Sequence, residues 1–221
     1  MSIAENLNAI NETLPAEVTL VAVSKTKPVE VLEEAYAAGQ RVFGENRVQE
    51  MASKYEELPK DIAWHLIGQL QTNKVKYIAP FVSLIHAVDS LKLLKEINKR
   101  AAQNDRVIDV LLQIFIAKEE TKFGLSEEEL AELLRHETYQ SMEHIRVRGL
   151  MGMATNTSDT EVVQREFASL KQLFDDTSKE FFADQPTFSI LSMGMSGDYP
   201  LAVEAGSNMV RVGSAIFGAR H

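Results

Sequence analysis

The stretch Thr19-Leu-Val-Ala-Val-Ser-Lys25-Thr-Lys-Pro28 contains four consecutive apolar residues after Thr19, two of them β-branched. This run predicts a short buried strand, and Pro28 suits the first turn of a following helix. Because side chains alternate along a strand, Val21, Val23 and Lys25 share one face. Lys25 is therefore expected at the carboxyl end of a buried strand, on a face otherwise made of valines.

Burial at such a position disfavours the charged ammonium and lowers the pKa of the Lys25 amine. A lowered pKa is what a lysine needs to form a Schiff base with a carbonyl compound. The alternative is a lysine whose stem lies along the strand end while its ammonium reaches solvent. The strand alone leaves both interpretations open.

Short apolar runs alternate with helical patterns along the whole chain. The expected strands are 18–24, 41–43, 62–67, 82–88, 107–117, 145–153, 188–193 and 209–212. The expected helices are an opening helix at about 2–13, then 29–39, 45–58, 72–79, 90–104, 126–135, 160–182 and 197–205. Eight strand–helix alternations without a linker or repeat predict an α/β fold, a single (β/α)₈ TIM-type barrel domain over residues 1–221. A doubly wound open sheet is the alternative, and it is disfavoured because no G-x-G-x-x-G follows the first strand.

The composition excludes several classes of function. The chain has no cysteine, which removes disulfides, thiolate catalysis, zinc–thiolate sites and Fe–S clusters. Its net charge of −9 argues against non-specific binding to nucleic acid or anionic membranes, and no H-E-x-x-H spacing supports a metal site. The first fifteen residues lack the Lys or Arg and the apolar core of a signal peptide, and the longest nearly apolar run, 78–88, is too short to span a bilayer. We therefore expect a cytoplasmic protein.

Two small-residue turns follow the last two expected strands. Ser192-Met-Gly-Met-Ser-Gly-Asp198 comes after the seventh strand, where Gly197 lets the backbone approach an anion and Ser196 adds a hydroxyl donor. Gly213-Ser214 forms a similar turn after the eighth strand. In (β/α)₈ barrels these two loops often bind a phosphate group.

Arg211 lies within the apolar strand Met209-Val-Arg-Val212, and a buried guanidinium is costly unless it is paired. A structural ion pair with a neighbouring carboxylate is one explanation. The other is that Arg211 faces the barrel mouth together with Lys25, with Arg211 near a ring nitrogen and Lys25 forming an imine. With a phosphate in the glycine turns, this second arrangement describes a site for pyridoxal 5′-phosphate. His65 and His86 are expected as hydrogen-bonded core histidines rather than residues of the mouth.

Several motifs, in order and spread over nearly the whole chain, resemble the pyridoxal phosphate homeostasis proteins, which are related to the N-terminal barrel of alanine racemase. These motifs are Ala22-Val-Ser-Lys-Thr-Lys-Pro28, Phe43-Gly-Glu-Asn46 with Val48-Gln-Glu50, Trp64-His-Leu-Ile-Gly68, Leu70-Gln-Thr-Asn-Lys74, Gly149-Leu-Met151, Ser192-Met-Gly-Met-Ser196 and Val210-Arg-Val-Gly213 with Ile216-Phe-Gly218.

The resemblance implies that pyridoxal phosphate is carried on Lys25. The cofactor-binding residues that it implies are Lys25, Asn46, Met193, Ser196, Gly197, Arg211, Gly213 and Ser214. Among these, Arg211 would contact the pyridine nitrogen, whereas Asn46 and Met193 would lie near the ring. Lys122 matches a family lysine suspected of receiving cofactor at a secondary site.

The same residues favour a carrier over an enzyme. A racemase of the related family takes a second base, a tyrosine, from an additional domain, and this chain ends at His221. Tyr199 is poorly placed for that role, and Arg211 would keep the pyridine nitrogen unprotonated and weaken the electron sink. We therefore expect a monomeric carrier and buffer that gives up its cofactor to an incoming amine or to an apoenzyme that depends on pyridoxal phosphate. The alternatives are a weak amino-acid racemase and a barrel that binds another phosphorylated metabolite without an imine.

Overall fold

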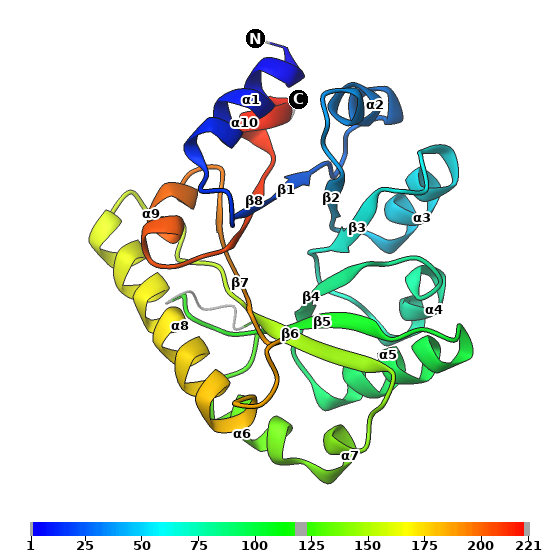
Figure 1. Ribbon diagram of the computed structural model, residues 1–221, viewed down its shortest axis with the longest axis vertical. Coiled ribbons are helices and arrows are strands. Elements are labelled where there is room, and N and C mark those ends of the chain that lie inside the picture. Colours follow the sequence, from blue (N-terminus) through cyan, green and yellow to red (C-terminus); the bar gives the residue numbers. More distant parts are fainter. Residues whose placement is uncertain (1, 118–122, 219–221) are drawn as a thin grey trace.

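The computed structural model describes residues 2–117 and 123–218. Its eight parallel strands are β1 (Thr19–Val23), β2 (Val42–Glu45), β3 (Ala63–Leu66), β4 (Leu84–Val88), β5 (Ile108–Gln113), β6 (Ile145–Met151), β7 (Ile190–Met195) and β8 (Met209–Val212). They pair in sequence order and close into a barrel because β1 also pairs with β8, with Val21 opposite Arg211 (Figure 1). The predicted (β/α)₈ barrel is confirmed, and the open sheet is excluded.

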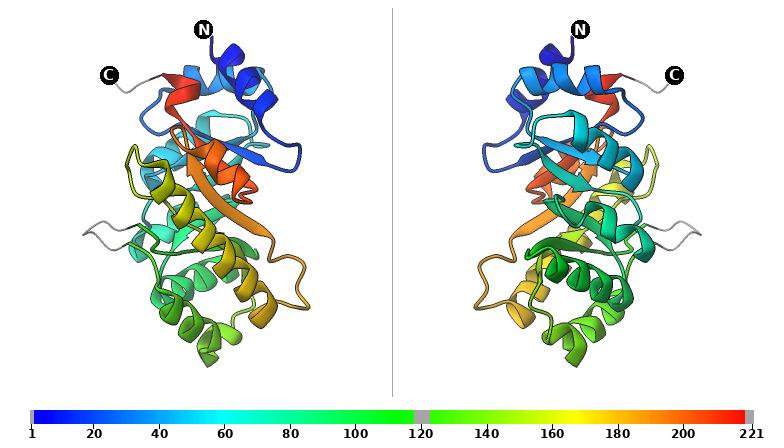
Figure 2. Two further views of the ribbon diagram at one scale, coloured as in Figure 1. Left: turned by 90° about the vertical axis from the view of Figure 1, so that its left-hand side faces the viewer. Right: turned by 90° about the vertical axis from the view of Figure 1, so that its right-hand side faces the viewer.

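The helices lie outside the ring of strands (Figures 1 and 2). They are α1 (Ile3–Thr13), α2 (Val29–Ala37), α3 (Val48–Glu57), the 3₁₀ helix η1 (Thr72–Lys74), α4 (Val75–Ile78), α5 (Leu91–Gln103), α6 (Glu127–Arg135), α7 (Glu137–Gln140), α8 (Thr160–Phe181), α9 (Tyr199–Glu204) and α10 (Ser214–Phe217). Ser2 and Ser126 begin α1 and α6 with complete capping boxes, as the S-x-x-E spacing predicts. No helix within these described residues is long and apolar enough to cross a membrane.

Several predicted boundaries differ from the structure, most of them by one or two residues. Glu45 ends β2 rather than beginning a helix, because its carboxylate is held by buried partners at the strand end. The strand predicted at 107–117 ends at Gln113. The short helices α7 and α10 were not predicted, since four-residue helices carry too little periodicity to detect.

Apolar side chains fill two regions. The larger cluster lies between strands and helices, and the smaller one fills the barrel interior with Val21, Leu84, Leu111, Met151 and Met209 among its members. The alternation predicted for β1 is confirmed, because Val21 belongs to the interior whereas Leu20 and Ala22 belong to the outer layer. Lys25, two residues past Val23, consequently lies at the mouth of the barrel.

Candidate functional site

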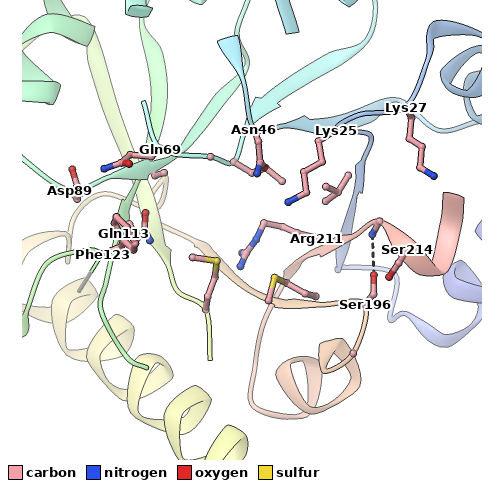
Figure 3. Close-up of a pocket in the computed structure, with 18 of the residues that line it drawn as sticks. Lys25, Lys27, Asn46, Gln69, Asp89, Gln113, Phe123, Ser196, Arg211 and Ser214 are labelled. Atoms are coloured by element: carbon pink, nitrogen blue, oxygen red, sulfur yellow. Dashed lines mark hydrogen bonds between the residues drawn. The ribbon is translucent and has the colours of Figure 1, made fainter. Parts of the chain in front are cut away.

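A cavity of about 480 Å³ opens at the carboxyl ends of the strands (Figure 3). Seven of the eight predicted site residues line it, namely Lys25, Asn46, Ser196, Gly197, Arg211, Gly213 and Ser214. Residues more than 180 positions apart in the sequence therefore meet in one space. Lys122 lies outside the described residues.

Met193 is the exception, because it does not line the cavity. Its side chain is fully buried in the layer between strands and helices, because its neighbour Ser192 points into the barrel and strand side chains alternate. The register with β8 then shifts between Ser192 and Met195, and Met195 lines the cavity instead. A bulge of this kind cannot be recognised from an apolar run in the sequence.

Lys54 of α3 organises a group of buried charges behind β1. Its ammonium donates hydrogen bonds to the Ser24 carbonyl oxygen at 2.9 Å and to one oxygen each of Glu45 and Glu50 at 2.7 Å. The side chain of Lys54 is 6% exposed, and that of Glu45 is fully buried. Burial raises the pKa of the Glu45 carboxyl, while the positive charge of Lys54 opposes that rise.

These charges hold the chain on both sides of Lys25. The Ser24 hydroxyl donates to Glu45 at 2.6 Å, and the Thr26 backbone amide donates to Glu50 at 2.6 Å. Thr26 has a φ of +65°, a left-handed conformation that a β-branched residue adopts only when its surroundings enforce it. Lys25 is therefore presented to the cavity from a backbone that is fixed before and after it.

Arg211 begins a chain of hydrogen bonds through the barrel interior. Its guanidinium donates to the Ser192 hydroxyl oxygen at 2.6 Å and to the Gly152 carbonyl oxygen at 3.0 Å. The Ser192 hydroxyl is left to donate to His86 Nδ1 at 3.1 Å, which leaves His86 Nε2–H to donate to His65 Nδ1 at 3.0 Å. Both histidines are buried and bonded, which confirms them as core residues.

The charge states of the residues in this hydrogen-bond network follow from their burial. Burial lowers the pKa of Arg211 to about 10, so the guanidinium keeps its charge at neutral pH. Burial also lowers the pKa of His65 to about 3 and that of His86 well below its usual value, so both rings are neutral. No ion pair between Arg211 and a carboxylate occurs among the described residues, so the predicted alternative of a structural ion pair is not the arrangement found.

The turns after β7 and β8 are bonded to each other. The Gly213 amide donates to the Ser196 hydroxyl oxygen at 3.1 Å, the dashed contact in Figure 3. The helix predicted from Gly197 begins at Tyr199, because Asp198 accepts the Met195 amide at 2.6 Å and closes a turn first. The first amides of α10, beginning with Ser214, precede its intrahelical bonds and remain available as donors.

Glycine fits the cavity wall in both turns for different reasons. A Cβ at Gly197 would meet no atom within 4 Å, so this residue faces open space beside the cavity. A Cβ at Gly213 would approach the Val23 carbonyl oxygen at 3.0 Å. Together the turns offer amides and hydroxyls on one wall, next to the positive charge of Arg211, and this combination suits a phosphate group.

Tyr199 does not line the cavity. Its hydroxyl lies 3.1 Å from Thr13 Oγ1, on the outside of the barrel. The Tyr199 hydroxyl is therefore engaged away from the cavity.

Sequence reasoning missed a second group of polar residues that line the cavity. Gln69 follows β3, Asp89 directly follows β4, and Gln113 ends β5. The general rule that barrel sites lie at the carboxyl ends of strands was the signal that could have found all three. The described residues hold no group of three or more histidine, aspartate or glutamate side chains arranged for a metal ion.

Comparisons with known proteins agree with this geometry. Residues 1–221 match the family described as alanine racemase, N-terminal domain. A pyridoxal phosphate homeostasis protein of Aquifex aeolicus is 44% identical over 202 residues, covering 91% of this chain and 86% of the relative. One from Schizosaccharomyces pombe is 40% identical over 206 residues, covering 92% of this chain and 84% of the relative.

Solved structures are similar over the same length. PipY of Synechococcus elongatus, determined with PLP bound, has a TM-score of 0.89 and 38% identity, covering 98% of this chain and 100% of its own. An alanine racemase of Clostridium difficile has a TM-score of 0.77 at 18% identity, and the match covers 99% of this chain and 60% of the racemase. The racemase likeness shows the fold alone.

Proposed function

Because the chain belongs to the pyridoxal phosphate homeostasis proteins, within the alanine racemase N-terminal domain family, we propose that it binds pyridoxal 5′-phosphate as an imine of Lys25. The observation that carries the proposal is the meeting of Lys25, Arg211 and the two small-residue turns in one cavity. The similar protein PipY has been solved with PLP bound, which supports the same ligand here. The role that follows is in vitamin B6 homeostasis.

The residues present fit the three chemical features of this cofactor. Its aldehyde needs a primary amine, which Lys25 supplies on a fixed backbone. Its phosphate needs hydrogen-bond donors, which the turns of Ser196–Gly197 and Gly213–Ser214 supply. Its pyridine nitrogen needs a donor, and Arg211 has N–H groups beyond the two bonded to Ser192 and Gly152.

Asn46 completes the wall beside Lys25 (Figure 3). When bound, pyridoxal phosphate supplies an aldehyde carbon that exchanges one amine for another. The chain's own part is to hold that carbon at Lys25 and to keep the cofactor oriented through the phosphate turns.

A carrier and buffer that supplies cofactor fits this site better than an amino-acid racemase. A racemase needs two bases on opposite faces of the cofactor, and neither tyrosine nor histidine is among the described residues that line the cavity. Arg211 remains charged at neutral pH, and a cation beside the pyridine nitrogen disfavours protonation of that nitrogen. Apoenzymes that depend on pyridoxal phosphate are the proposed recipients, and the monomeric state and cytoplasmic location stay predictions from the sequence.

The decisive experiment is the absorbance spectrum of the protein with pyridoxal phosphate, before and after borohydride. We expect an imine band that borohydride removes, with the reduced cofactor mapped to the peptide containing Lys25. Lys25→Ala should abolish the band and retain the fold, whereas Lys27→Ala, which removes a neighbouring lysine of the same cavity, should keep it. A band of full intensity in Lys25→Ala would place the imine on another lysine, and a protein without any band would favour a different phosphorylated ligand. Interconversion of L- and D-alanine at enzyme-like rates would overturn the carrier role.

A further inference from the structure

The cavity has two chemically different ends. In Figure 3, Lys25, Arg211, Ser196 and Ser214 lie toward one side, whereas a second group lies across from them. The second group contains Gln69, Asp89, Gln113 and Phe123. None of these four side chains is used by the cofactor contacts proposed above.

Gln113 gives the second end a polar side chain at its wall. The residue is 7% exposed, and its side-chain amide has no hydrogen-bond partner among the described residues although it lines the cavity. The side-chain amide atoms of Gln113 are not among the fully buried atoms that lack a partner, so they face the cavity with their hydrogen-bonding capacity open to whatever fills it. A polar ligand that enters the cavity can take these contacts in place of solvent.

Asp89 gives this end a negative charge. Its carboxylate accepts a hydrogen bond from its own backbone amide and forms no ion pair with a described lysine or arginine. Burial raises the pKa of this carboxyl, as expected for an anion without a counter-charge. Gln69, an exposed residue, adds a second amide oxygen at the rim.

We propose that Gln69, Asp89 and Gln113 form a docking subsite for the amine that receives the cofactor, and that this subsite selects an alkyl diamine without a carboxylate. An ammonium group carries three N–H donors and a positive charge, which match two amide oxygens and one carboxylate. The described residues at this end include no lysine or arginine, so the carboxylate of an α-amino acid would face Asp89 without a counter-charge. The inference rests on the proposed function and names its acceptor class.

The chemistry of release needs no further reactant. One ammonium of the diamine stays on Asp89 and Gln113, which act as positioning residues. The nitrogen at the other end bonds to the aldehyde-derived carbon of the cofactor while the bond between that carbon and Lys25 Nζ breaks. The step starts from the protonated imine and a neutral attacking nitrogen. That nitrogen gives one proton to Lys25 Nζ, so Lys25 leaves as a neutral amine and the new imine keeps the positive charge.

Three probes with the same five-carbon chain separate the effect of the second ammonium group from the effect of a carboxylate. They are 1,5-diaminopentane, 1-aminopentane, which lacks the second charge, and lysine, which adds a carboxylate. The loss of the Lys25 imine band gives a second-order rate constant for each probe at equal concentrations of free amine. We expect 1,5-diaminopentane to react fastest, with an advantage over 1-aminopentane of about three- to fivefold, the size expected for one partly exposed charge pair.

Asp89→Asn should remove that advantage and leave the rate with 1-aminopentane unchanged. Asp184→Asn, which removes an exposed carboxylate that does not line the cavity, should retain it. A second readout is the binding of 1,5-diaminopentane to borohydride-reduced protein by calorimetry, where no transfer occurs and Asp89→Asn or Gln113→Leu should weaken binding.

The subsite proposal is wrong if the wild type and Asp89→Asn prefer 1,5-diaminopentane over 1-aminopentane to the same degree. It is also wrong if lysine reacts as fast as 1,5-diaminopentane. If imine formation at Lys25 succeeds but these preferences are absent, only the subsite fails. If no imine forms at Lys25, the proposed function fails and the subsite for its acceptor fails with it.

Discussion

Lys54→Met tests how much the buried charges behind β1 contribute to the stability of the fold. The substitution removes three hydrogen bonds, to Ser24, Glu45 and Glu50, and leaves Glu45 fully buried with only the Ser24 hydroxyl as partner. Removing one partner of a buried ion pair costs about 3–5 kcal/mol. We expect the lower end, about 3 kcal/mol at pH 7, because Glu45 can take up a proton and Glu50 is partly exposed to solvent.

The pH dependence has a definite sign. The pKa of Glu45 is already raised by burial, and loss of the Lys54 charge raises it further. A carboxyl whose folded pKa is raised binds more protons in the folded state, so stability is lost as pH rises from its usual pKa of 4.5 through the raised value. The penalty of Lys54→Met should therefore be larger at pH 8 than at pH 5.

Urea unfolding followed by the fluorescence of Trp64, the single and fully buried tryptophan, measures these effects. Adding Glu45→Gln to Lys54→Met removes the stranded charge and should recover about 2 kcal/mol. Lys171→Met, which breaks a more exposed pair with Asp175, should cost below about 0.5 kcal/mol. A loss below about 1 kcal/mol in Lys54→Met, or no recovery in the double variant, would refute the reasoning.

Three further expectations concern the site and the barrel. Ser214→Ala should weaken cofactor retention by about 1–3 kcal/mol in equilibrium dialysis, since a donor to a charged group is lost, and unchanged retention would place the phosphate elsewhere. Gly149→Ala should destabilise the barrel by about 3 kcal/mol or more, because its Cβ would lie 1.7 Å from the Ile190 carbonyl oxygen, whereas Gly197→Ala should leave the melting temperature unchanged. As the pH falls below 6.5, the free energy of unfolding should decrease by up to about 1.4 kcal/mol per pH unit, because His65 is buried in its neutral form and stays neutral when the unfolded chain takes up a proton. A His65→Gln variant whose stability declines as steeply as that of the wild type would contradict this.

The barrel was predictable because each strand carries its own local signal. The pattern of β1 identified both its burial and the face that Lys25 shares, and β8 has the predicted bounds, Met209–Val212. The position of the turns Ser196–Gly197 and Gly213–Ser214 on the cavity wall was predictable from a general rule, since barrel sites lie at the carboxyl ends of the strands. Arg211 was found because a charge inside an apolar run demands an explanation.

The remainder depends on contacts between distant residues. Glu45 was assigned to a helix because a charged residue beside a charged segment has that local preference. Its burial at the end of β2 is stabilised by Lys54, nine positions later, and the local pattern does not reveal this contact. Gln113 is an ordinary polar residue in sequence, and its place in the cavity wall depends on how the strands close into the barrel. Met193 lies outside the barrel interior because Ser192 before it points inward, and the register shift after Ser192 brings Met195 to the cavity instead.

The barrel closes between the first strand and the last, and Asn6 of α1 donates to the Ile216 carbonyl oxygen of α10 at 2.9 Å. The two helices lie side by side in Figure 1. Gly213 follows Lys25 by 188 residues in the sequence, so during translation the lysine is made long before the two turns that form the opposite wall of the cavity. On the proposed function, cofactor loading at Lys25 would follow synthesis of Gly213 and Ser214, and a product truncated before these turns would carry the amine without the proposed phosphate donors.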